Sequence, residues 1–230
     1  MILYNSCIHA ETCASRLFAR MAVRLAILGA AAAGAVALPA RSQTINMFPK
    51  DVQQAWTRVA IPPSHPLSAN DEWHINAKSR EIVCDGNLGG HEFLRFNREL
   101  ANFDFKVEWK FTPVPGTAKY NSGVFFRNSK DGSIWHQAQT SLGGGYIFAE
   151  TMVDGKLTRV NLQKEMTENR VKPAGQWNAY DIHCVGDTCT LAVNGKVVNT
   201  LHLSVEKGYV GLEAEGYQIT FRHLRLEQLP

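Results

Sequence analysis

Apolar and polar residues alternate along many short segments of this chain. In the clearest segment, residues 102–111, every odd position is apolar and every even position is polar. A period of two is typical of a strand with one buried and one solvated face. Similar runs predict strands at residues 80–85, 91–96, 122–128, 133–140, 145–151, 157–163, 178–185, 208–214 and 217–227.

Turn residues separate these segments. Asn194-Gly195 lies between two β-rich runs, which is a strong signal for a two-residue hairpin. Residues 162–170 are the best helical candidate, but they lie between strand patterns and could form a loop with one turn. A succession of more than ten short strands predicts an all-β fold, a two-sheet jelly-roll sandwich.

The chain begins with a segment of different character. Residues 21–42 begin with a short segment that carries one Arg, Arg24, and continue with a run of small and apolar residues that ends in small residues, which is the signature of a secretory signal peptide. The run is shorter than the ~20 apolar residues of a membrane span. Residues 1–20 precede this complete leader, so Met21 is a candidate for the true start. We therefore predict a secreted or periplasmic protein with no stable membrane span.

The rest of the chain divides into two parts. Residues 43–70 are rich in Pro, Ser and Asn and predict a linker or an N-terminal arm packed on the body. Residues 71–230 are the predicted jelly-roll domain. With 45% hydrophobic and 20% charged residues, the 230-residue chain has ordinary globular composition and can form one well-cored domain.

The charge of the chain is concentrated at its start. The formal net charge is +3, but residues 1–42 hold four of the Lys and Arg residues and one Glu, which leaves 20 basic and 20 acidic residues in the remainder. Binding to nucleic acid requires a basic surplus on one face. We therefore expect no nucleic-acid partner.

Three cysteines follow the predicted leader: Cys84, Cys184 and Cys189. The last two flank residues 185–188, a hairpin-sized loop with turn residues at its centre. Opposed across the base of that hairpin, they could come within bridging distance, and export would permit a disulfide. We predict a Cys184–Cys189 bridge and a free Cys84, with two buried thiols as the alternative.

Five short motifs follow one another along the chain. They are 102–111 (NFDFKVEWKF), 121–127 (NSGVFFR), 173–178 (PAGQWN), 193–195 (VNG) and 208–222 (GYVGLEAEGYQITFR). Together they resemble the 3-keto-disaccharide hydrolase domain family (DUF1080) over nearly the whole predicted mature chain. The resemblance implies a concanavalin-like jelly roll and a carbohydrate or glycoside ligand.

The chain departs from the family pattern at two positions. Gln137 stands where the family usually has an acidic residue, two positions before Gln139, and Glu213 replaces a usual Gln. Two functions therefore remain open. The first is an exported enzyme that cleaves 3-keto-glycosides, and the alternative is a non-catalytic carbohydrate-binding module.

The chemistry of a 3-keto sugar indicates which residues an enzyme would need. A C3 ketone acidifies the C2 proton, so that a base can remove it, expel the group at C1 and let water add back. Strand alternation puts Glu213 and Glu215 on one face, and we predict that one of them, with Glu215 taken first, is the base. Arg127 is the candidate for binding the ketone oxygen.

Other residues are candidates for binding the sugar. Gln137 and Gln139 share one strand face with amides suited to hydroxyls, and Asn121 begins the NSG motif. Trp135 and Tyr146 could present flat surfaces to a sugar ring. By its strand parity, Trp109 is predicted to lie in the core and His136 on the surface. A divalent metal held by separate strands is conceivable, but sequence spacing does not reveal its ligands.

Overall fold

The computed structural model describes residues 41–86, 91–116 and 119–230. The predicted start and signal peptide lie outside these residues, apart from Arg41 and Ser42. Within the described part, strands dominate, and neighbouring strands pair antiparallel. No helix in this part is long and apolar enough to cross a membrane.

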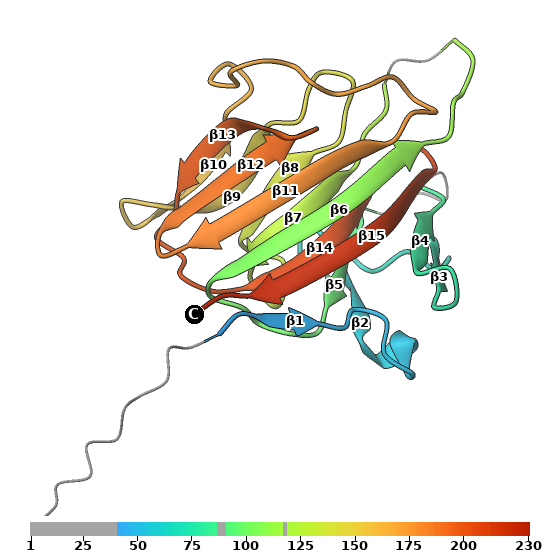
Figure 1. Ribbon diagram of the computed structural model, residues 1–230, viewed down its shortest axis with the longest axis horizontal. Helices are drawn as coiled ribbons and strands as arrows, with labels where there is room; N and C mark the ends of the chain where they lie inside the picture. Colours follow the sequence, from blue (N-terminus) through green and yellow to red (C-terminus); the bar gives the residue numbers. More distant parts are fainter. Residues whose placement is uncertain (1–40, 87–90, 117–118) are drawn as a thin grey trace, which may run out of the picture. The chain divides into compact units, whose positions relative to one another are not determined.

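Two sheets lie face to face (Figure 1). The eight-stranded sheet has the order β13-β12-β11-β6-β15-β4-β3, and β1 pairs with β15 beside this path. Its strands are β13 (Lys196–His202), β12 (Thr188–Val193), β11 (Asn178–Val185), β6 (Phe103–Phe111), β15 (Ile219–Gln228), β4 (Glu81–Cys84), β3 (Trp73–Asn76) and β1 (Gln43–Ile45).

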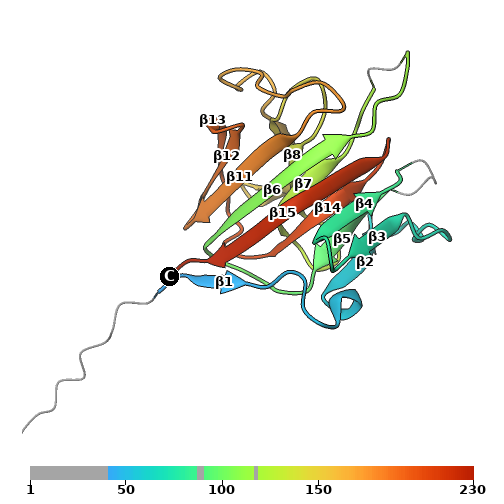
Figure 2. The same cartoon turned by 45° about the vertical axis from the view of Figure 1, so that its right-hand side comes forward.

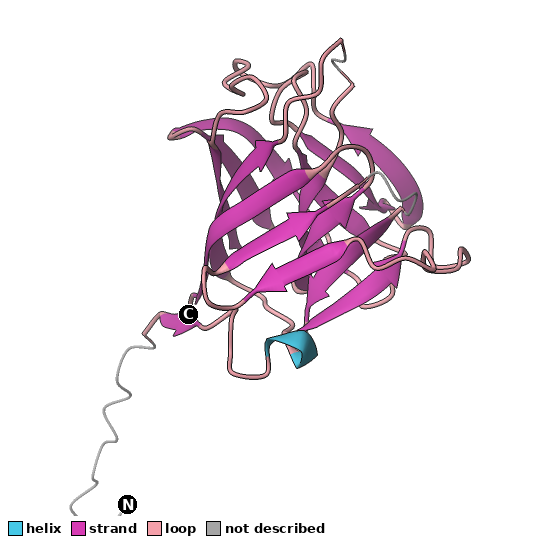
Figure 3. Ribbon diagram, turned by 90° about the vertical axis from the view of Figure 1, so that its right-hand side faces the viewer, coloured by secondary structure: helices cyan, strands magenta, loops and turns pink. Residues whose placement is uncertain are grey.

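The second sheet has seven strands in the order β10-β9-β8-β7-β14-β5-β2. They are β10 (Lys156–Asn161), β9 (Ile147–Val153), β8 (Trp135–Gln139), β7 (Gly123–Asn128), β14 (Tyr209–Ala214), β5 (Glu92–Phe96) and β2 (Trp56–Ala60). Figure 3 shows the strands of the sandwich and the loops that connect them. This confirms the predicted all-β jelly roll.

Strand alternation fills the space between the sheets. Phe105 and Trp109 of β6 are at most 1% exposed and face the core. Val124 of β7 and Leu212 of β14 contribute to the same core cluster from the other sheet. Burying these side chains supplies the main stabilisation of the fold, about 1.5–3 kcal/mol for each large apolar side chain. The predicted strand at 102–111 is thus confirmed, including its buried face.

The proline-rich residues 43–70 contribute to both sheets. β1 pairs with β15, β2 pairs with β5, and the short 3₁₀ turn η1 (Val52–Gln54) lies between them. Figure 2 shows these N-terminal strands beside β15 and β5. The sequence of β2, WTRVA, does not alternate strictly between apolar and polar residues, so the strand was not predicted. In the structure only Trp56 and Ala60, at its two ends, are buried.

Two local predictions are decided by the structure. Residues 162–170 form a loop with one turn, the second of the two alternatives, and contain no helix. His136, predicted at the surface, is fully buried, and its Nε2 lies 2.9 Å from the hydroxyl of Thr151. Strand parity gave its face correctly, but that face points into the core, where a hydrogen-bonded imidazole is tolerated.

The two hairpins of the eight-stranded sheet agree with prediction. Cys184 and Cys189 are directly opposed across β11 and β12, with their Cα atoms 4.2 Å apart, and form a disulfide, whereas Cys84 is free and buried. Asn194 and Gly195 both have positive φ, at 48° and 86°. These are the conformations that a type I′ turn requires between β12 and β13.

Candidate functional site

A cavity of about 680 Å³ lies on the outer face of the seven-stranded sheet. Strand alternation places it there, because Phe125, Gln137 and Glu213 line the cavity while their neighbours along the strands face the core. The sheet order brings β8, β7 and β14 side by side at its floor. A volume of this size is typical of a small-molecule site.

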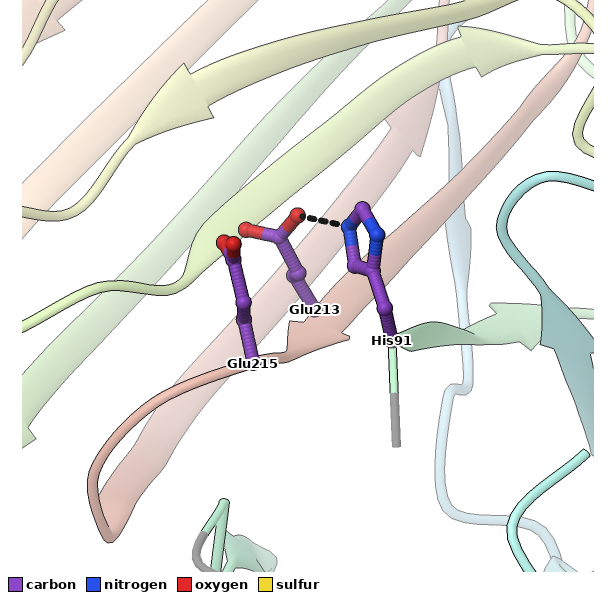
Figure 4. A group of neighbouring side chains, drawn as sticks. All are labelled: His91, Glu213 and Glu215. Carbon is purple, nitrogen blue, oxygen red and sulfur yellow. Dashed lines mark hydrogen bonds and ion pairs between the residues drawn. The ribbon is translucent and has the colours of Figure 1, made fainter. Parts of the chain in front are cut away.

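Glu213 lies in the wall of this cavity with its carboxylate 2% exposed. One oxygen is 3.1 Å from Nε2 of His91, as Figure 4 shows, and the other accepts a hydrogen bond from the amide of Gln137. The backbone carbonyl of Glu213 accepts a 2.7 Å hydrogen bond from the hydroxyl of Ser122. The carboxylate is therefore fixed from both sides.

Burial changes the proton affinity of this group. Removal of Glu213 from water, with a smaller contribution from the nearby Glu215, raises its pKa to about 7, although the hydrogen bond from His91 opposes the shift. The same hydrogen bond raises the pKa of His91. Glu213 can therefore gain or lose a proton close to neutral pH.

Glu215 lies beside Glu213 but is exposed at the cavity wall. Its carboxylate accepts a hydrogen bond from Nδ2 of Asn121, whose Oδ1 in turn accepts one from Nε2 of Gln139. This chain of polar groups continues the wall that Glu213 and Gln137 begin. The structure thus brings five predicted polar residues into one cavity: Asn121, Gln137, Gln139, Glu213 and Glu215.

The absence of a side chain at Gly123 makes the Gln137–Glu213 contact possible. Gly123 lies on β7, between the strands that carry these two residues. A Cβ atom placed on Gly123 would clash with the Gln137 amide. A glycine is needed at this position of the NSG motif because the Gln137 side chain passes over it to reach Glu213.

One group of residues could hold a metal ion. An imidazole nitrogen of His91 and one carboxylate oxygen from each of Glu213 and Glu215 lie within 4.8 Å of one another. Figure 4 shows the three side chains converging. Nitrogen and carboxylate donors are suited to divalent ions such as Zn²⁺ or Mn²⁺. Sequence spacing could not find this set, because His91 is more than a hundred residues from the glutamates.

Arg127 does not line the cavity, contrary to the prediction from parity. It is fully buried, and its guanidinium donates to the backbone carbonyls of Ala101, Gly186 and Val205 at 2.7–3.2 Å. The φ of Arg127 is +49°, and the register between β7 and β14 shifts near this residue. This irregularity breaks the alternation, so Arg127 joins three loops together instead of facing a ligand.

The two aromatic residues predicted to bind the sugar lie in different places. Trp135 lines the cavity, whereas Tyr146 does not. Tyr146 precedes β9 and lies close enough to the core residue Tyr180 to contribute, after burial, to the raised pKa of the Tyr180 phenol. Trp109 is buried in the core, as predicted.

Sequence reasoning missed three charged or titratable residues of the cavity, His91, Glu150 and Arg159. His91 precedes β5 next to Glu213, and Arg159 of β10 reaches the cavity beside Trp135 and Phe148. Arg159 also pairs with Glu150 at 3.0 Å. The alternation of β10 could have flagged Arg159 as sharing a face with Leu157, but the sequence does not indicate which strand borders the cavity.

The fold and the cavity define the class of this protein as a concanavalin-like jelly roll. It is similar to a candidate glycosyl hydrolase from Parabacteroides distasonis (TM-score 0.55, 15% identity, 81% of this chain and 94% of that one). It is also similar to the carbohydrate-binding module CBM66 from Bacillus subtilis (0.52, 14%, 74% and 93%) and to a β-glucanase from Bacillus licheniformis (0.51, 10%, 84% and 100%). At these identities the likeness concerns the fold alone.

The family follows from the sequence itself. A model of the 3-keto-alpha-glucoside-1,2-lyase-like domain matches residues 64–227, and the chain belongs to this family. This confirms the resemblance based on the five motifs and identifies a carbohydrate-active protein. No curated protein matches the chain.

The two departures from the family pattern lie on a single hydrogen bond. Gln137, where the resemblance led us to expect an acid, donates to Glu213, where it led us to expect Gln. The pair consists of an amide on β8 and a carboxylate on β14. Position 137 considered alone suggests that the cavity lacks an acid, but Glu213 supplies a carboxylate in direct contact with Gln137.

Proposed function

We propose that the cavity is the active site of an enzyme that cleaves 3-keto-glycosides by elimination followed by hydration. The observation that carries this proposal is the placement of Glu213, a buried carboxylate in the cavity wall held between His91 and Gln137. Its raised pKa suits a general base that works near neutral pH. The family supports the choice of substrate class.

In the first step Glu213 accepts the C2 proton of the sugar. The C2–H electron pair forms the C1=C2 double bond, and the C1–O bond breaks with its electrons remaining on the leaving oxygen. That oxygen takes a proton, for which His91 and Glu215 are the titratable groups beside Glu213. Glu213 then passes its proton to solvent, and the group that protonated the leaving oxygen regains one from solvent. Water adds its hydroxide to C1 and its proton to C2, so the net reaction is hydrolysis.

Polar side chains of the cavity supply the remaining requirements. Negative charge develops on the C3 oxygen as the C2 proton leaves, and stabilising it requires a cation or hydrogen-bond donors. Because Arg127 lies outside the cavity, we assign this role to hydrogen-bond donors of the polar wall, the amide nitrogens of Asn121 and Gln139, each of which donates one N–H to a neighbouring side chain and carries a second. The amide N–H groups of Gln137 are engaged by Glu213 and by the Ser122 carbonyl, which leaves its oxygen to accept from a sugar hydroxyl.

A non-catalytic carbohydrate-binding module is the second candidate function. The observation that favours it is Gln137 at the position where the family usually carries an acid. A module of this kind needs the polar and aromatic walls of the cavity but no proton transfer. It would bind glycosides and release the same molecules unchanged.

Incubation with 3-keto-glucosides of both anomeric configurations separates the two functions. We expect release of the group at C1, with deuterium from heavy water incorporated at C2 of the sugar product. Binding without release would favour the module. A parallel incubation with a chelator tests the group at His91: release that persists supports Glu213 as the base, and release that requires an added divalent ion assigns Glu213 to a metal.

We also propose that the protein acts after export. The composition of residues 21–42 supports this, and so does the Cys184–Cys189 disulfide, because oxidising compartments favour such bonds. Expression of the full chain in a bacterial host, followed by fractionation and N-terminal sequencing, tests the proposal. A mature form starting near residue 41 or 43 in the periplasm or the medium is the expected result, and an unprocessed cytoplasmic form contradicts it.

A further inference from the structure

Polar and aromatic side chains are segregated along the cavity. Gln139, Gln137 and Trp135 are alternate residues of β8 on the cavity face, spaced at ~6.6 Å per step. The two amides contact Asn121 and Glu213. Trp135, one step further along the strand, packs instead against aromatic rings. The cavity therefore has a polar end, where the proposed chemistry takes place, and a second end of different character.

The second end is built by a small apolar cluster that is separate from the main core. Its rings are close together: Trp135 lies 5.2 Å from Phe148 and 6.3 Å from Phe125, centroid to centroid, both edge to face. Ile61 belongs to the same cluster but lies beside His91, whose backbone carbonyl accepts a 2.9 Å hydrogen bond from the N–H of Ile61. We therefore call Phe125, Trp135 and Phe148 the apolar end.

The apolar end remains open to solvent. Leu157 of β10 lines it with 55% of its surface exposed. The rim carries a cation, since the Arg159 guanidinium is 5.5 Å from the ring centroids of both Trp135 and Phe148. Exposed apolar surface that adjoins a polar reaction site is suited to an apolar part of the ligand.

Few polar groups at this end could satisfy a second sugar. Among the described residues that line it, the polar side chains are Ser133, Glu150 and Arg159, and the last two already pair with each other at 3.0 Å. A second sugar would lose water from several hydroxyls with few partners in return, and each unsatisfied group is costly. An apolar leaving group would lose nothing and would cover Leu157 and Trp135.

We propose that the apolar end is a leaving-group subsite for a hydrophobic aglycone, so that the ligands of this chain are glycosides of apolar alcohols or phenols rather than disaccharides. The inference deepens the proposed function and rests on it for the placement of the sugar at the polar end. Trp135, Phe148 and Leu157 are then the residues that determine specificity for the leaving group.

Calorimetric titration of the full chain tests this subsite without any reaction. The ligands are unoxidised hexyl glucoside, methyl glucoside and the matching disaccharide, each in both anomeric configurations. For the preferred anomer we expect hexyl glucoside to bind at least tenfold more tightly than either of the others, because burial of each additional CH₂ favours binding. Equal affinities, tighter binding of the disaccharide, or no detectable binding of any of them would overturn the inference.

Two variants locate the preference. Leu157→Ser removes an exposed side chain and is expected to reduce the hexyl-to-methyl ratio about threefold, and Trp135→Ala is expected to abolish it. Trp177→Ala is the matched control, because Trp177 stacks with Arg222 and does not line the cavity. If Trp135→Ala fails to fold, Leu157→Ser decides, and an unchanged ratio in Leu157→Ser contradicts the inference.

The outcome can be separated from that of the proposed function. A chain that binds hexyl glucoside preferentially but cleaves no 3-keto-glucoside has the subsite and lacks the activity. A chain that cleaves 3-keto-glucosides with no preference between hexyl and methyl glycosides has the activity and lacks the subsite.

Discussion

The two outer faces of the sandwich carry hollows of equal volume whose carboxylates have different surroundings. Each measures about 680 Å³, one on the seven-stranded sheet and the other on the eight-stranded sheet around Lys106 and Glu108. In the second hollow the acids are part-exposed and each has a cation: Lys106 is 2.7 Å from Asp181, and Arg222 is 2.8 Å from Glu108. In the first, Glu213 is buried and meets an imidazole and an amide.

This difference has a direct consequence for proton affinity. Partial burial opposes the shift at Glu108, but hydrogen bonds from Arg222 and His223 lower its pKa. Burial raises the pKa of Glu213 to about 7. A carboxylate that stays ionised and paired belongs to a solvated charged surface, whereas one that can exchange a proton near neutral pH suits catalysis. Cavity size does not distinguish the two faces, but the surroundings of their carboxylates do.

The largest expected effect separates these two carboxylates by activity. Glu213→Gln keeps the size of the side chain and one oxygen that can accept from Gln137, but it removes the capacity to accept a proton. We expect a loss of about 10²-fold or more in kcat on 3-keto-glucosides, as for a general base. Glu108→Gln is the matched control and should retain full turnover. If Glu213→Gln retains turnover, Glu215 becomes the next candidate for the base.

The pH dependence of stability should have opposite signs at the two carboxylates. Because the folded pKa of Glu213 is raised from about 4.5 to about 7, its contribution to stability is present below pH 4.5 and is lost as pH rises toward 7. The amount is up to about 3 kcal/mol. Glu108, with a lowered folded pKa, contributes stability that is lost as the pH falls through that value.

Urea unfolding of the parent and of the two Gln variants at pH 5 and pH 8 measures both contributions. The free energy of unfolding of Glu213→Gln, measured relative to that of the parent, should be higher at pH 8 than at pH 5. A pH dependence identical in parent and Glu213→Gln would mean that Glu213 is not the buried acid that its surroundings indicate.

The third prediction concerns the glycine under the Gln137 side chain. Gly123→Ala forces that side chain away from Glu213, because its Cβ would occupy the same space. We expect a loss of about 1–3 kcal/mol in the free energy of unfolding, as for other overpacked sites. We also expect a lower kcat on 3-keto-glucosides. Gly143→Ala is the matched control, because its Cβ would find its nearest neighbours at 3.4 Å. Equal behaviour of the two variants would show that Gln137 is not held through Gly123.

The smallest effect is expected on the charged outer face. Lys106→Ala removes the partner of Asp181, but both side chains are about half exposed. Such pairs contribute less than about 1 kcal/mol. Thermal melts at low and high salt measure the change, and we expect it to shrink with added salt. A destabilisation of several kcal/mol would show that this hollow is more specifically organised than its exposure indicates.

The sequence by itself determined the all-β class, most strands and both hairpins. The alternation in β6 and the Asn194-Gly195 turn act between neighbours in the chain, so their signals are local. The pairing of Cys184 with Cys189 could be predicted for the same reason. The parity of β14 also placed Glu213 and Glu215 on one face correctly, because alternation within one regular strand needs no knowledge of its neighbours.

The tertiary structure decided which residues complete the site. The left-handed backbone at Arg127 takes its side chain to three loops, which strand parity cannot foresee. His91 and Arg159 reach the cavity only because β5 and β10 belong to the same sheet as β14, an arrangement set by long-range pairing. The pKa of Glu213 likewise follows from burial, and burial is a property of the packed sheet rather than of the residue.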